Sequence, residues 1–336
     1  MGTAVWKSVR RCCGALTTFG LLVVLLFALM GCASPSEAPV DAKAVRMAVS
    51  EECLSALALL AEERDTFASY ELDVTVTRYS SSQLALEALR NGRVDVAMCA
   101  DTPIVLAALE GDSPRIIATI GSSANDIKVL ARADHGIVSP EDLIGARIGT
   151  RERTAADFFL HTFLGRHGML AQDVEVVYGS FEEVVDALAT GTLGAAALRP
   201  PHLGDAQQRL GDGAVTFEEP GLYVKTMNVV VSDSVSLEVC VKLLEALIAV
   251  EPEASVHLCD ESSAELAETL DMDVESVCDS LCSNQFEVRL DQSLLLTLED
   301  AARWAAGPDA DAPDFLYQFF TDPLDKIDSR RVSVIR

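Results

Sequence analysis

The chain has 336 residues, and its 52 acidic side chains outnumber its 26 Lys and Arg side chains, which gives a formal net charge of −26 at pH 7. This excess of negative charge disfavours nucleic acid and anionic lipid headgroups as partners, because both would be repelled. It does not determine the charge of a ligand, since a pocket can be locally positive on an acidic protein. The length exceeds that of a usual single core and predicts two lobes.

The first 31 residues are typical of a secretory signal. Lys7, Arg10 and Arg11 precede an uncharged, mostly apolar run at 14–30, which indicates an export signal and not an element of the fold. An uncleaved anchor stays open as an alternative, because a spanning helix needs roughly 20 apolar residues. The run ends in Leu-Met-Gly-Cys at 29–32 and resembles a bacterial lipobox. That resemblance implies that Cys32 becomes the N-terminus and carries acyl chains such as palmitate, each buried methylene contributing ~0.8 kcal/mol of anchoring.

The segment that follows the predicted signal reads as a tether. Residues 32–44 are rich in Pro, Ala, Ser and acidic side chains and show no periodic pattern, which indicates a linker to the first strand. Six cysteines lie beyond Cys32, and an exported chain permits either disulfides or buried thiols, whose pairing the sequence does not decide. No His lies at zinc-site spacing from these cysteines. We therefore expect neither a metal nor a cofactor.

Apolar runs then alternate with helical patterns, as in α/β proteins. Strands are predicted at 45–49, 72–78, 94–99, 115–120 and 127–132, with helices at 54–64, at 83–91 and from Pro103 onward. Ser80, Ser81 and Ser82 offer an N-cap for the second of these helices, and Pro103 has the first-turn position that helices favour. This part of the chain predicts one β/α lobe.

A second β/α unit follows. Its predicted strands lie at 146–149, 174–178, 195–198 and 215–217, and its helices at 154–167 and 181–189. The apolar strand predicted at 227–231 is expected to lead back into the first lobe. From residue 237 the pattern is helical, at 237–250, 262–270, 273–283, 291–306 and 313–320. We therefore predict a first lobe of residues 45–130 plus 230–330, a second lobe of residues 131–229, and crossings between them at 128–133 and 225–232.

Four phrases of the chain, at 86–97, 142–150, 155–170 and 184–197, resemble the nitrate/sulfonate/taurine-type solute-binding proteins of ABC importers. Thiamine-pyrimidine binders belong to the same group. The resemblance implies an α/β, two-lobed periplasmic-binding-protein fold of type II (Venus-flytrap) with a helical C-terminal part, closing on its ligand by hinge motion. It also implies an exported protein at the cell membrane or in the periplasm, with an ABC permease and ATPase as partners.

The chain departs from this group in one region that bears on the ligand. It has Gly194-Ala195-Ala196-Ala197 where members usually carry an acidic residue, and Leu-Arg-Pro-Pro at 198–201 in place of a Trp-x-Pro-like element. The resemblance therefore implies the fold without giving the identity of the ligand.

Polar residues follow the predicted strands of both lobes. Open α/β sheets bind ligands beyond the carboxyl ends of their strands, where helix N-termini offer free N–H groups. A plainer interpretation of each position is an N-cap or a solvated loop residue, but their recurrence on one side of both lobes predicts a cleft. The candidate ligand-binding residues are Ser50, Glu51, Ser81, Ser82, Asp101, Thr102, Ser122, Arg151, Arg153, Thr154 and Arg199.

Two electrostatic hypotheses compete for the ligand of this cleft. The arginines of the second lobe could bind an oxyanion such as a sulfonate. The acidic residues of the first lobe, Glu51, Glu52 and Asp101, could instead bind a cationic group. A zwitterion such as an aminosulfonate would satisfy both sets.

Other functions on the same fold stay open. They are a pyrimidine-binding protein, a ligand-sensing lipoprotein without a transporter, and an enzyme like those of the menaquinone pathway. The sequence contains no Ser-His-Asp elbow, no Gly-rich phosphate loop and no metal-spaced His pair, so we expect no catalytic residues.

Overall fold

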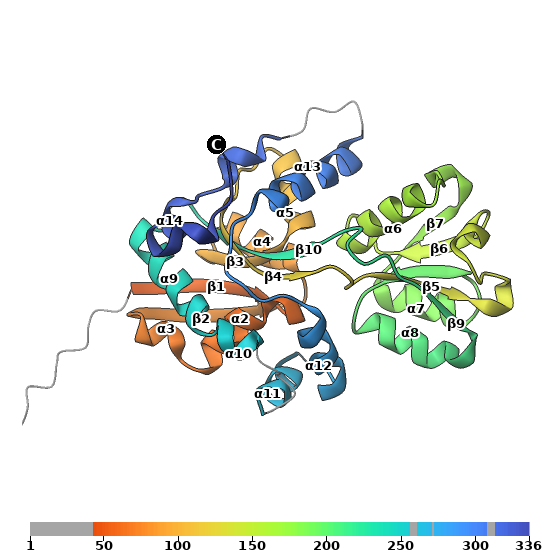
Figure 1. Ribbon diagram of the computed structural model, residues 1–336, viewed down its shortest axis with the longest axis horizontal. Helices are drawn as coiled ribbons and strands as arrows, with labels where there is room; N and C mark the ends of the chain where they lie inside the picture. The colour runs from red at the N-terminus through yellow and green to blue at the C-terminus, as the bar shows by residue number, and fades with distance from the viewer. Residues whose placement is uncertain (1–42, 256–260, 271, 308–312, 336) are drawn as a thin grey trace, which may run out of the picture. The chain divides into compact units, whose positions relative to one another are not determined.

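The computed structural model describes residues 43–255, 261–270, 272–307 and 313–335. The predicted signal at 1–31, Cys32 and nearly all of the predicted tether lie outside the described residues. The described chain builds two five-stranded mixed sheets, with strand orders β2-β1-β3-β10-β4 and β7-β6-β8-β5-β9 (Figure 1). The predicted α/β class is confirmed.

The first sheet takes its strands from two distant parts of the chain. β1 pairs in parallel with β2 and β3, whereas β10 runs antiparallel to both β3 and β4. All five residues of β3 are buried, as expected for a strand in the middle of a sheet that is covered on both faces. The strands are β1 (Lys43–Ser50), β2 (Leu72–Tyr79), β3 (Val96–Ala100), β4 (Arg115–Ser123) and β10 (Lys225–Val231).

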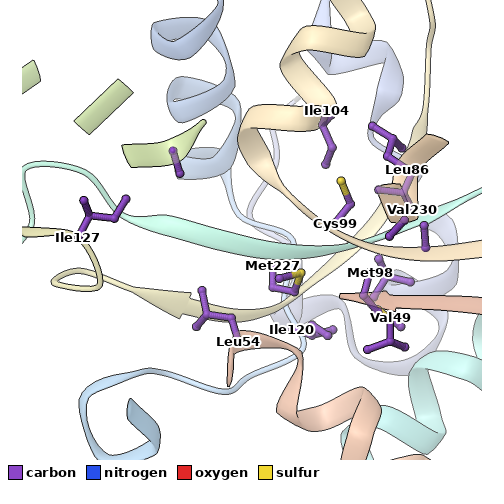
Figure 2. Packing of buried hydrophobic residues seen from close by; sticks show 14 of the residues in the cluster. Val49, Leu54, Leu86, Met98, Cys99, Ile104, Ile120, Ile127, Met227 and Val230 are labelled. Carbon is purple, nitrogen blue, oxygen red and sulfur yellow. The ribbon is translucent and has the colours of Figure 1, made fainter. Parts of the chain in front are cut away.

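Short turns lead from the carboxyl ends of the parallel strands into helices. β1 is followed by the 3-10 turn η1 (Cys53–Ser55), α2 (Ala56–Glu63) and α3 (Thr66–Ser69), β2 by α4 (Ser82–Arg90), and β3 directly by α5 (Asp101–Leu109). In β3, Cys99 points toward Ile104 of α5, whereas Met98 lies on the opposite face near Val49 (Figure 2). Because the strands are parallel, these helices begin at the same edge of the sheet.

The second sheet repeats this arrangement. β6 pairs in parallel with β7 and β8, and β5 runs antiparallel to β8 and β9. The strands are β5 (Lys128–Arg132), β6 (Arg147–Thr150), β7 (Glu175–Tyr178), β8 (Ala195–Leu198) and β9 (Ala214–Phe217). The helices are α6 (Ala155–Arg166), α7 (Phe181–Ala189) and α8 (His202–Leu210), with 3-10 turns η2 (Ala133–His135), η3 (Pro140–Leu143), η4 (Ala171–Asp173) and η5 (Gly211–Gly213).

The two crossings between the sheets precede the predicted ones. β4 ends at Ser123 in the first sheet and β5 begins at Lys128 in the second, so the first crossing is at 124–127. The second lies between β9 and β10, at 218–224. The predicted lobe boundaries at 130 and 229 thus fall inside β5 and β10. The apolar runs of these segments form central strands, and the chain crosses in the more polar residues before them.

The C-terminal part is helical, as predicted, and packs on the first sheet. Helix α13 packs on α5, and α14 packs on α9. The elements are α9 (Leu237–Ala249), α10 (Glu251–Ser255), α11 (Glu261–Leu270), α12 (Val274–Ser283), α13 (Gln292–Ala306), η6 (Phe315–Gln318), α14 (Asp322–Asp328) and η7 (Ser329–Arg331). None of the helices in the described ranges is both long and apolar enough to cross a membrane.

One predicted helix of this part is wrong. The segment 313–320 is the short turn η6, after which Phe319 forms an isolated bridge with Ile116 of β4. Phe315 and Phe319 are both buried, and their spacing of four suggested a helical stripe. The helix instead begins at Asp322, with Pro323 in its first turn, where a missing backbone N–H costs no hydrogen bond.

Candidate functional site

A small cavity of about 60 Å³ lies where strand ends of both sheets face each other. We call it the strand-end pocket. Elements of the first sheet contribute Glu52, Ser81, Ser82, Gln83, Ala100, Pro103 and Lys225, and elements of the second contribute Arg151, Arg153, Thr154, Ala155, Ala156, Phe181 and Arg199.

Four helices begin at the strand-end pocket: α4, α5, α6 and α7, the last of which starts at Phe181. At α4, the Ser81 hydroxyl accepts a hydrogen bond from the backbone N–H of Leu84 and caps the helix. At α6, the Thr154 hydroxyl instead donates to the Arg151 carbonyl at 2.7 Å, so no side chain caps this helix. A helix N-terminus carries unpaired N–H groups and a partial positive charge, both of which favour an anion.

Arg151 and Arg153 bring positive charge to the same place. Both side chains are exposed, and neither has a hydrogen-bond or ion-pair partner within the described residues. The backbone of Arg153 is left-handed, with φ +57°, and its N–H donates to the carboxylate of Asp157 at 2.8 Å. This bond fixes the turn that leads into α6 and leaves both guanidinium groups available to a ligand.

Unlike Arg151 and Arg153, the side chain of Arg199 has partners within the described part of the protein. Its guanidinium lies 5.6 Å from the centre of the Phe181 ring and donates to the Pro200 carbonyl at 3.0 Å. Phe181 also stacks on His202, with ring centres 5.1 Å apart. Burial, and after it the charge of Arg199, lower the pKa of His202, which keeps the imidazole neutral at pH 7. The cation at this wall of the pocket is therefore Arg199.

A buried cluster of charges lies beneath the pocket. The ammonium of Lys225 contacts Glu52 Oε2 at 2.7 Å and Asp126 Oδ2 at 3.0 Å, and Ser82 donates to Glu52 Oε1 at 2.9 Å. Burial opposes ionisation of Glu52, but Lys225, Arg199 and the hydrogen bonds outweigh it and lower the pKa of Glu52 to about 2. Burial likewise opposes charging of Lys225, yet Asp126 and Glu52 raise its pKa. Glu52 is thus ionised and already paired.

The strand-end pocket brings together six of the predicted site residues: Ser81, Ser82, Arg151, Arg153, Thr154 and Arg199. The other five do not line it. Glu51 is exposed outside the lining, and the backbone N–H of half-buried Ser122 donates to the Gln285 carbonyl.

The remaining three of these five residues are fully buried. Ser50 is hydrogen-bonded to Ser55 and Ser82. Asp101 accepts hydrogen bonds from the Tyr223 hydroxyl at 2.5 Å, the Thr226 N–H at 3.0 Å and the Thr102 hydroxyl at 3.1 Å. Ser50, Asp101 and Thr102 thus form hydrogen bonds inside the fold, because they lie just behind the strand ends and not at the pocket.

Lys225 lines the pocket and was not among the residues predicted from the sequence. It lies just before the strand predicted at 227–231, and a single Lys at the start of a buried strand was the available signal. Phe181 packs in the core and also lines the pocket.

The described cysteines form no metal site. Cys53, Cys99, Cys240 and Cys282 are free thiols. Nowhere in the described ranges do three or more His, Cys, Asp or Glu side chains gather closely enough to hold a metal ion.

Residues 55–207 match the family model described as NMT1/THI5 like. The chain contains an NMT1/THI5-like domain. Over 177 residues it is also 27% identical to a protein of Brucella abortus (strain 2308) that is named as a binding protein. That alignment covers 52% of this chain and 54% of the relative, so the chain matches about half the length of this relative.

Solved structures extend the similarity to most of the fold. The aliphatic sulphonate binding protein SsuA of Escherichia coli is 15% identical, with a TM-score of 0.68 over 83% of this chain and 92% of that one. SsuA of Xanthomonas axonopodis, bound to MOPS, is 16% identical, with a TM-score of 0.67 over 84% and 99%.

The nitrate-binding protein NrtA of Synechocystis PCC 6803 is 13% identical, with a TM-score of 0.67 over 86% of this chain and 89% of that one. The predicted periplasmic-binding-protein fold, and the resemblance to this group, are confirmed. At these identities the structural likeness establishes the fold alone.

Proposed function

We propose that the protein is an extracytoplasmic solute-binding lipoprotein that captures a small oxyanion-bearing molecule and delivers it to an ABC importer. Sulfonates, taurine and nitrate are the ligand types that fit. The observation that carries this proposal is the strand-end pocket, where Arg151, Arg153 and Arg199 gather at the uncapped N-terminus of α6.

The charges of the strand-end pocket favour an anion over a cation. Guanidinium groups bind oxyanions through charge-assisted hydrogen bonds of fixed geometry. None of the acidic residues that could have bound a cation is available in the pocket: Glu52 pairs with Lys225, Asp101 is buried and accepts four hydrogen bonds, and Glu51 lies outside the lining.

The size of the strand-end pocket supports the same ligand class. A volume of about 60 Å³ corresponds to the space of about two water molecules in the liquid. That space suits a nitrate ion or the head of a sulfonate. Two of the solved structures with this fold are sulfonate-binding proteins and one is a nitrate-binding protein. Their ligands support the same class.

The proposal includes export, cleavage after Gly31 and acylation of Cys32, followed by delivery to a permease and an ATPase. It assigns no catalytic residue. A sensor lipoprotein without a transporter would use the same pocket, and a neighbouring gene pair for a permease and an ATPase would distinguish the importer subunit from it.

Thermal unfolding in the presence of methanesulfonate, taurine, nitrate, bicarbonate and a pyrimidine tests the ligand class. Because a ligand that binds only the folded state stabilises it by mass action, we expect one of the first three compounds, each of which carries an oxyanion group, to raise the melting temperature. A response to the pyrimidine alone would contradict the oxyanion proposal and favour a pyrimidine-binding protein. No response to any compound would contradict it as well.

Arg199→Ala tests the site itself. A hydrogen bond to a charged group contributes about 1.5–3 kcal/mol, so loss of Arg199 should weaken anion binding by about 10- to 100-fold, measured by calorimetric titration. Arg166→Ala, an exposed arginine at the other end of α6, is the matched control and should bind like the parent. Equal affinities of the two variants would place the anion outside the strand-end pocket.

A further inference from the structure

A second and much larger cavity lies between α6 and α13. It has a volume of about 880 Å³, and we call it the α6–α13 cavity. Its lining shares no residue with the strand-end pocket. Side chains of α6, of α13 and of the crossing at 218–224 contribute most of it. Those that carry the argument are Phe158, His161, Thr162, Tyr223, Thr297 and Trp304.

Three aromatic rings form one wall of the α6–α13 cavity. Phe158 meets Tyr223 edge-on, with ring centres 5.1 Å apart and planes at 80°, and meets Trp304 at 5.5 Å and 51°. The Tyr223 hydroxyl donates to the buried carboxylate of Asp101, which fixes this ring. Trp304 is half-buried, and its indole N–H has no partner among the described residues. The wall thus offers aromatic faces and one free donor.

The polar lining of the cavity carries no net formal charge. Its Asp and Arg side chains, Asp300 and Arg303, form an ion pair with each other, and its histidine, His161, counts as neutral in the formal charge. The hydroxyls of Thr162 and Thr297 donate to helix carbonyls at 2.9 and 3.2 Å, so their lone pairs remain free to accept. Such a lining suits an uncharged compound, because a charged one would lose hydration without gaining an opposite charge.

We propose that the α6–α13 cavity is a second small-molecule site, which binds an uncharged planar ring compound that carries hydrogen-bonding groups. The ring would stack on Trp304 and Phe158, and its polar groups would bond the indole N–H and the threonine hydroxyls. The volume lies in the range of 300–1,000 Å³ that is typical of ligand pockets. Asp101 follows Ala100, which lines the strand-end pocket, and accepts hydrogen bonds from Tyr223 and Thr226, which line the α6–α13 cavity.

The fluorescence of Trp304 can report binding at this site. The chain has two tryptophans, Trp6 and Trp304, so the full-length Trp6→Phe protein fluoresces from Trp304 alone. The probe is 4-nitrobenzyl alcohol, an uncharged ring compound that quenches indole fluorescence on contact. We expect saturable quenching that exceeds the collisional quenching of free N-acetyltryptophanamide. Cyclohexylmethanol, which lacks an aromatic ring, should compete at least about tenfold more weakly.

Two glycine substitutions test whether the probe binds in the α6–α13 cavity. Gly165 lines the cavity on α6, and a Cβ there meets no atom within 4 Å, so the side chain that Gly165→Leu adds to the cavity begins in open space. It should weaken probe binding by about tenfold or more. Gly204→Leu makes the same change at an exposed and equally open position on α8, away from the cavity, and should bind the probe like the parent.

Three results would overturn the proposal: quenching that does not saturate, equal affinities of the two leucine variants, or full displacement of the probe by an anion that stabilises the protein. The anion-induced rise in melting temperature is measured separately. An anion response without saturable quenching would reject the second site alone, and saturable quenching without an anion response would reject the proposed ligand class alone.

Discussion

Three charged side chains, Glu52, Lys225 and Asp126, lie buried or nearly buried beneath the strand-end pocket. Taking charges out of water is costly unless they are paired and hydrogen-bonded, and removing one partner leaves the other uncompensated, at a cost of about 3–5 kcal/mol. Lys225 satisfies both carboxylates. The ammonium of Lys225 offsets one of the two negative charges, and the three arginines of the pocket outweigh the one that remains and set its sign.

Glu52→Gln should change how stability depends on pH. The folded-state pKa of Glu52, about 2, lies below the ordinary value of 4.5. Ionised Glu52 therefore stabilises the fold fully above pH 4.5, and this contribution decreases as the pH falls from 4.5 toward 2. Between pH 6 and pH 3, the parent should lose about 2 kcal/mol more free energy of unfolding than the variant does, as measured by urea titration.

Glu51→Gln is the matched control for this experiment, because Glu51 is the exposed neighbour outside the pocket lining. It should keep the pH dependence of the parent. If Glu52→Gln kept it too, the buried ion pair with Lys225 would not be what holds Glu52 ionised.

At the scale of elements, β4 and η1 approach each other closely at one glycine. A Cβ on Gly121 of β4 would lie 2.6 Å from the backbone carbonyl oxygen of Leu54 in η1. Backbone atoms cannot move aside as a flexible side chain can. This contact sets how closely η1, which follows β1 and precedes the helices on that side, packs on the sheet.

Gly121→Ala should therefore destabilise the protein by about 1–3 kcal/mol, the usual cost of overpacking, measured as a lower urea midpoint with an unchanged slope. Gly204→Ala, at an open helical position, should instead raise the free energy of unfolding by about 0.4–1 kcal/mol through a less flexible unfolded chain. If both variants unfolded like the parent, the close approach of β4 and η1 would be absent in solution.

Most elements could be predicted from the sequence because their apolar periodicity is regular. The buried run of β3 and the Ser81 cap of α4 are examples. The crossings were misplaced because an apolar run such as 127–132 does not show which sheet it joins. Long-range pairing decides that. For the same reason, local polarity did not separate Asp101, buried under Tyr223, from Arg151, which faces the pocket.

For the molecule as a whole, the proposed function requires a place at a membrane as well as a pocket. Removing residues 1–31 takes away three positive charges and no negative ones, so the proposed mature chain carries a net charge of −29. An anionic membrane surface would repel such a chain. Attachment would therefore depend on the acyl chains at Cys32.

Cys32→Ser tests this attachment. We expect the parent to sediment with membranes and to incorporate labelled palmitate, and the variant to do neither, because one side chain supplies the acylation site. Cys53→Ser removes a half-buried thiol of the folded part and should leave both properties unchanged. A Cys32→Ser protein that still sedimented with membranes would indicate the uncleaved anchor.

Lys225 begins the strand that returns the chain to the first sheet, and its side chain is only 4% exposed. Amine-modifying reagents such as formaldehyde with a mild reductant should methylate the surface lysines within minutes and reach Lys225 only when the two sheets swing apart. A solute that keeps them together would slow that single modification. The rate of Lys225 methylation, followed by mass spectrometry, would therefore report how often the two sheets move apart.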